Sequence, residues 1–123
     1  MAAKKTFPIK LNGSISWISG TDDDEFGRSV KRGIFRSSNE IVLHCEYGGW
    51  QYDISLKRTT GYRFEGEFHA HQGQRTVPIT ASGTLYSNEE GYLLFGKWLE
   101  EGYEYIWWAE LRPVDHFDDE SQD

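Results

Sequence analysis

Two histidines have a spacing that could bind a metal ion. His69 and His71 flank Ala70 in a segment that alternates apolar and polar residues. In a β-strand this spacing places both imidazoles on one face, as in some zinc sites. A third ligand would have to come from another segment, and Asp53 and Glu67 have the matching parity. The same parity places the pair on the outer, solvated face. We therefore predict no metal site, and His69 and His71 are the weak candidates for one.

An acidic run offers a second possible site for a cation. Asp22-Asp23-Asp24-Glu25 supplies carboxylate oxygens, which are the ligands that Ca²⁺ prefers. The run lacks the alternating ligand positions and the distal glutamate of an EF-hand loop. A solvated acidic loop is the better interpretation.

The pattern of nucleophiles does not indicate an enzyme. Cys45 is the single cysteine and shares a strand face with Ile41 and Leu43, which is typical of a small buried apolar residue. The chain has no Gly-x-Ser-x-Gly elbow and no glycine-rich phosphate loop. We predict that the protein is not an enzyme and uses no cofactor.

Composition limits the class of protein. The chain has 123 residues, 15% of them aromatic, and fits one domain whose interior is filled by large rings. Its net charge of −7 makes nucleic acid an unfavourable partner. No apolar run approaches the roughly 20 residues of a membrane span. One cysteine and no signal-peptide pattern favour a cytoplasmic location.

Strands must position all of these residues. Apolar and polar residues alternate with period two through most of the chain, which predicts β-strands rather than helices. Turn signals such as Gly48-Gly49 and Glu100-Glu101-Gly102 separate the runs. The expected strands lie near 13–19, 28–36, 40–47, 50–58, 61–71, 75–87, 91–100 and 103–112.

Eight strands with short connections define an all-β fold. Sequential neighbours must pair antiparallel, which gives a meander. We predict a closed up-and-down β-barrel, because closure removes the exposed edge strands, and a two-sheet β-sandwich is the alternative. Residues 1–12 form an N-terminal arm, 13–113 the barrel, and 114–123 an acidic tail.

The strand count, meander order and length resemble the avidin/streptavidin-like barrels and, more distantly, the lipocalin-like group. Those families tend to carry Gly-x-Trp in the first strand. Here the first strand reads Gly13-Ser14-Ile15-Ser16-Trp17, and Gly96-Lys97-Trp98 has the family spacing in the seventh strand. The resemblance implies an up-and-down barrel.

The last hairpin suggests an interaction surface. Parity in strand 103–112 turns Ile106 and Trp108 outward. Strand 91–100 is apolar on both faces, so one apolar set must also stand outside. We predict a protein interface, as a homodimer or with another protein, formed by Tyr92, Leu94, Trp98, Ile106 and Trp108. Burial of this surface by Phe7-Pro8-Ile9, or by Val114 and Phe117, is the alternative.

A second functional prediction concerns the interior. The inward positions of the expected barrel hold many rings with polar tips, which suits a pocket for a small flat ligand. The same rings could simply fill the barrel. The residues predicted to line the pocket are Trp50, Tyr52, Tyr62, Phe64, Tyr103, Tyr105 and Trp107.

Overall fold

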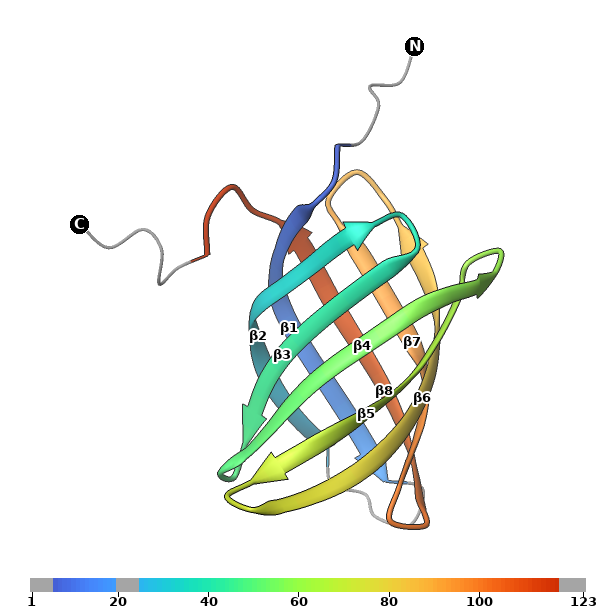
Figure 1. Ribbon diagram of the computed structural model, residues 1–123. Coiled ribbons are helices and arrows are strands. Elements are labelled where there is room, and N and C mark those ends of the chain that lie inside the picture. Colours follow the sequence, from blue (N-terminus) through green and yellow to red (C-terminus); the bar gives the residue numbers. More distant parts are fainter. Residues whose placement is uncertain (1–5, 20–24, 118–123) are drawn as a thin grey trace, which may run out of the picture.

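The computed structural model describes residues 6–19 and 25–117 (Figure 1). Eight antiparallel strands follow one another around a closed barrel. The predicted all-β meander and its closure are confirmed, and the sandwich alternative was wrong. The strands are β1 (Ile9–Ser19), β2 (Glu25–Ser37), β3 (Glu40–Tyr47), β4 (Trp50–Thr60), β5 (Arg63–Gln72), β6 (Arg75–Ser87), β7 (Tyr92–Glu100) and β8 (Tyr103–Pro113).

The first and last strands close the barrel. β1 pairs with β8 from Leu11 opposite Pro113 to Ser19 opposite Tyr105. Every described strand therefore has a hydrogen-bonded neighbour on both sides. A partner cannot add a strand to such a sheet and must pack against its face or enter one end.

The first strand begins earlier than the sequence predicted. β1 starts at Ile9, inside the segment expected to be an arm, and continues through Gly13. The pairing of β1 with β2 shifts register between Leu11 and Gly13. A Cβ on Gly13 would lie 1.8 Å from the carbonyl oxygen of Glu110, so glycine here permits a close approach of β1 to β8.

One end of the barrel carries the β3–β4, β5–β6 and β7–β8 turns, and we call it the turn end. Gly48 and Gly49 have φ values of 56° and 82°, as the predicted two-residue hairpin turn requires. Glu101 and Gly102 also have positive φ and join β7 to β8. These tight turns fix the register of each hairpin.

The opposite end is closed by aromatic side chains. The rings of Phe7 and Phe35 are 6.4 Å apart, and those of Phe35 and Tyr92 are 4.9 Å apart. The amide of Val114 donates to the carbonyl of Lys10 at 2.9 Å, which holds the end of the described chain against β1. Both ends of the described chain lie at this end of the barrel (Figure 1).

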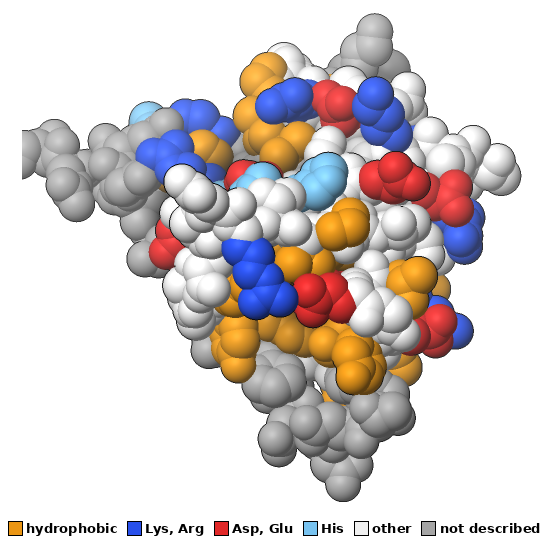
Figure 2. All heavy atoms as spheres, turned by 60° about the horizontal axis from the view of Figure 1, so that its bottom comes forward, with side chains coloured by type: hydrophobic (Ala, Val, Ile, Leu, Met, Phe, Trp, Pro, Cys, Tyr) orange, Lys and Arg blue, Asp and Glu red, His pale blue; other side chains and the backbone are white. Residues whose placement is uncertain are grey.

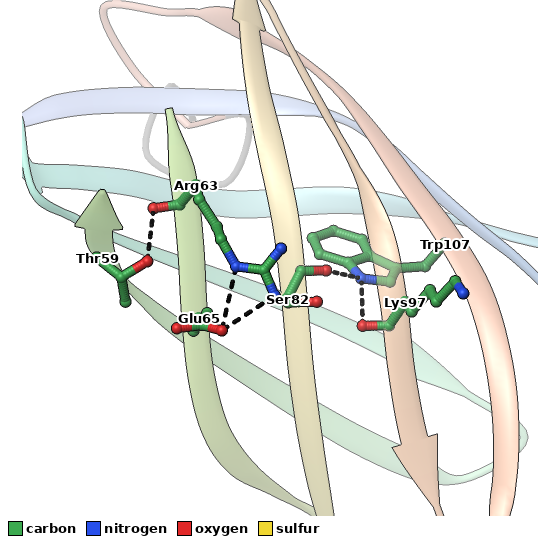
Figure 3. A network of polar contacts seen from close by, with 6 residues as sticks. All are labelled: Thr59, Arg63, Glu65, Ser82, Lys97 and Trp107. Carbon is green, nitrogen blue, oxygen red and sulfur yellow. Dashed lines mark hydrogen bonds and ion pairs between the residues drawn. The ribbon is translucent and has the colours of Figure 1, made fainter. Parts of the chain in front are cut away.

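The interior is packed around two tryptophans. Trp98 is 3% exposed, and its ring lies 5.5–6.5 Å from five others, those of Trp17, Tyr52, Phe68, Tyr105 and Trp107. Trp107 is fully buried. Its indole N–H donates to the carbonyl oxygens of Ser82, at 3.0 Å, and Lys97, at 3.3 Å (Figure 3).

Small residues make room for the Trp107 ring. A Cβ on Gly83 would lie 3.1 Å from Cζ2 of Trp107, so the indole packs directly over the β6 backbone.

The described residues include no helix long and apolar enough to cross a membrane.

Candidate functional site

The outer surface of β6, β7 and β8 carries a concentration of apolar side chains. Strand parity turns them outward, away from the packed interior. Tyr86, Phe95, Leu99 and Ile106 are 38–56% exposed, and Leu93 and Trp108 are half-buried. We call this set the outer apolar face; it comprises Tyr86, Leu93, Phe95, Leu99, Ile106 and Trp108.

Two rings form the centre of this face. Phe95 and Trp108 lie opposite each other in the β7–β8 ladder and stack with centroids 6.5 Å apart at 24°. Lys97 and Glu104 contribute the charges nearby, and Nζ of Lys97 lies 3.7 Å from Oε1 of Glu104. A groove of about 540 Å³ borders the face at Leu99. The face is thus apolar in the middle, with charges of both signs beside it.

Three residues of the predicted interface face the other way. Leu94 and Trp98 are buried in the core, and Tyr92 packs against it, so the prediction was wrong for these residues. The register explains why: Leu94 lies opposite Ala109 and Trp98 opposite Tyr105, and directly opposed residues share a face.

The outward set of β7 could have been found from the turn. A two-residue turn at Glu101 and Gly102 makes Glu100 the partner of Tyr103, and the rest of the register follows by counting. Because the inward parity of β8 was known, that count turns Leu93, Phe95 and Leu99 outward. Ile106 and Trp108 do lie on the outer wall, as predicted.

The chain termini do not cover this face within the described residues. Phe7 packs against Phe35 at the end of the barrel. Phe117 is buried, with the charged groups of Lys10 and Arg32 about 5 Å above its ring (5.3 and 5.1 Å). In the alternative prediction, Phe7-Pro8-Ile9 or Val114 and Phe117 bury the apolar surface of the last hairpin. The rings of Phe7 and Phe117 lie elsewhere and do not bury it.

The residues predicted to line an interior pocket separate into three groups. Tyr52, Phe64 and Trp107 are buried, and Trp50 and Tyr105 are half-buried at the core margin. Tyr62 and Tyr103 are 68% and 58% exposed, so neither lines an enclosed interior pocket. Tyr62 lies in the β4–β5 turn, and Tyr103 is the first residue of β8, opposite Glu100 at the turn end of the barrel.

The turn end combines aromatic rings with a carboxyl group. Glu100 is half-buried on the inward face of β7, two residues after Trp98. Burial raises the pKa of Glu100, and the neighbouring Glu101 raises it further. Burial and then the Glu100 charge raise the pKa values of Tyr52 and Tyr105, so this carboxyl group lies near both phenols.

Two groups at this end lack the partners that such groups usually have. The buried Nε1 of Trp98 has no hydrogen-bond partner among the described residues. Glu100 forms no ion pair with a lysine, arginine or histidine of the described chain. Arg75, at this end, instead pairs with Glu101 at 3.2 Å and lies over the ring of Trp50.

Glu100→Gln is expected to stabilise the protein at neutral pH. Because the pKa of Glu100 is raised in the folded state, the folded protein holds this proton at pH values at which the unfolded chain has already lost it. At neutral pH, where the carboxylate is ionised, its burial therefore lowers the free energy of unfolding. The melting temperature of the variant should exceed that of the wild type at pH 7 by roughly 2–5 °C. The gain should vanish below about pH 4. If the variant and the wild type had the same melting temperature at both pH values, Glu100 would be fully solvated in the folded protein.

The weak metal candidates remain without a third ligand. The His69 and His71 rings lie on the outer wall, 6.3 Å apart, and Nδ1 of His71 is 3.3 Å from Oγ1 of Thr76. Among the side chains that the structure describes, no three of His, Cys, Asp or Glu are grouped so that they could hold a metal ion. Of the acidic run, Asp22–Asp24 lie outside the described residues, and so does the side chain of Glu25.

The geometry defines a closed eight-stranded up-and-down β-barrel with a packed interior, an outer apolar face and a polar aromatic turn end. No protein-family model, no curated protein and no solved structure matches the chain significantly. The side chains on the surfaces of the barrel are therefore the features that bear on its function.

Proposed function

We propose that this chain is a non-enzymatic binding protein that associates with a second copy of itself through the outer apolar face. One observation supports this most: four of the six exposed large hydrophobic residues, Tyr86, Phe95, Leu99 and Ile106, lie on adjacent strands of one wall. Contiguous apolar surface of this kind is uncommon on monomers and usually marks a contact.

A second copy is the partner that this face suits best. The barrel offers no edge strand, so the contact must be face to face, and a two-fold axis is the commonest way to bury one face on both partners. Lys97 and Glu104 lie side by side, so the same surface rotated by 180° can bring a positive charge to a negative one. The stacked Phe95 and Trp108 rings would form the buried centre.

Replacing Phe95 or Trp108 with Asp tests this function. Each variant should weaken self-association at least about 30-fold, because an aromatic hot spot contributes 2 kcal/mol or more. Sedimentation velocity over a concentration series measures the association, and far-UV circular dichroism reports the fold. Tyr62→Asp is the matched control, since Tyr62 is an exposed aromatic residue in the β4–β5 turn. Unchanged association of the folded Phe95 variant, or equal loss in the control, would contradict the proposal.

We propose small-molecule binding at the turn end as a second function. The unpaired Nε1 of Trp98 favours it, because a buried donor without an acceptor costs about 1–3 kcal/mol and a ligand can supply that acceptor. The centre of the barrel is filled by rings, so the site would lie at Tyr105 and Glu100 rather than in the middle. The likeness to avidin-like barrels that we propose is a likeness of architecture alone.

A further inference from the structure

We infer that the turn end binds a small organic cation, such as a quaternary ammonium compound, between the carboxylate of Glu100 and the rings of Tyr105 and Tyr52. This inference rests on the second function proposed above and names its ligand class. It does not depend on the outer apolar face, which lies on the other side of the barrel wall.

The aromatic part of the site is formed by the rings of Trp98, Tyr52 and Tyr105. Trp98 lies 6.4 Å from Tyr52 with an interplanar angle of 22°, and 5.9 Å from Tyr105. Tyr105 is opposite Trp98 in the ladder, and Glu100 follows on the same face of β7. Ring faces carry negative charge density, so they attract a cation placed over them. Figure 2, which brings the turn end forward, shows hydrophobic side chains gathered beside acidic and basic ones.

The electrostatics of the turn end favour a cation over a neutral or anionic ligand. Glu101 of the same hairpin raises the pKa of the Glu100 carboxyl, and the charge of Glu100 in turn raises the pKa values of Tyr52 on β4 and Tyr105 on β8. Arg75 on β6 is paired with Glu101 and stacked on Trp50, so its charge is already neutralised locally. A partly desolvated carboxylate without its own cation is stabilised by a ligand that brings one.

The polar groups also limit the rest of the ligand. Nε1 of Trp98 can only donate a hydrogen bond, and it has no acceptor among the described residues. A ligand with an oxygen atom next to the cationic centre would supply that acceptor. Choline has both features, so it is a suitable probe of the class.

The test is a titration of intrinsic tryptophan fluorescence with choline chloride, at constant ionic strength and pH 7.5. We expect saturable quenching with a dissociation constant below about 10 mM. The neutral isostere 3,3-dimethylbutan-1-ol, which keeps the shape and hydroxyl but lacks the charge, should bind at least about tenfold more weakly. Glu100→Gln should weaken choline binding about tenfold or more and leave binding of the isostere unchanged.

Glu101→Gln is the matched control, because Glu101 is the adjacent carboxylate and is exposed and paired with Arg75. Its affinity for choline should stay within about threefold of the wild type. Equal binding of choline and its isostere would overturn the cation inference while leaving small-molecule binding intact. No saturable binding of either compound would overturn both. Equal losses in the Glu100 and Glu101 variants would show general electrostatic attraction rather than a site.

Discussion

Trp107→Ala is expected to lower the free energy of unfolding by about 3–5 kcal/mol, the usual range when a large buried ring is removed. The indole is fully buried and packs over Gly83, so its loss leaves a cavity that rigid backbone surrounds. The carbonyl oxygens of Ser82 and Lys97 also lose their shared donor. A domain of this size has about 5–15 kcal/mol in total, so the variant should unfold at much lower urea concentration.

Trp107→Phe separates the two contributions. It keeps most of the apolar volume but cannot donate to the two carbonyls, and it should lose less stability than the alanine variant, about 1–3 kcal/mol. Urea unfolding followed by circular dichroism measures both variants. A loss below about 1 kcal/mol for Trp107→Ala would mean that the indole does not occupy the core.

Gly96→Ala should be the most damaging of the single-methyl changes in β6 and β7. A Cβ at this position would lie 1.9 Å from the carbonyl oxygen of Ser82 and 2.5 Å from Cα of Gly83, and both are backbone atoms. The β6 and β7 strands would have to separate, which would also move the carbonyls that bind Trp107. We expect a loss at or above the upper end of the 1–3 kcal/mol range that is typical of overpacking.

Gly83→Ala provides the graded comparison. Its Cβ would meet Cζ2 of Trp107 at 3.1 Å, and a side chain can yield by a few tenths of an ångström where backbone cannot. The variant should therefore lose clearly less stability than Gly96→Ala in the same urea experiment. If the two variants were equally stable, β6 and β7 would not approach each other as closely as described.

Most of the barrel could be predicted because its residues repeat simple local rules. Gly48 and Gly49 adopt the positive φ that their dipeptide indicated. β3 ends immediately before this turn, and β4 begins immediately after it. Gly13 lies inside β1 and not at its start, where the predicted range 13–19 placed it, and glycine occurs both in turns and where two backbones approach closely. Only the neighbouring β8 backbone, with the oxygen of Glu110, distinguishes the two uses.

The candidate surfaces were harder to predict because both depend on neighbours in space. β7 is apolar on both faces, so alternation did not show whether Trp98 or Phe95 faces the core; its pairing with β8 does. No motif predicted the partial burial of Glu100, since a Glu-Glu-Gly segment is typical of a solvated turn. Its position inside the turn end follows from the parity it shares with Trp98.

Sedimentation equilibrium of the wild-type chain measures self-association through the outer apolar face. Over a series reaching about 100 µM, the measured mass should approach twice the 14.3 kDa of one chain. The mass of the Phe95→Asp variant should stay at that of one chain over the same series. A wild-type mass of one chain at every concentration would show that the outer apolar face does not mediate self-association.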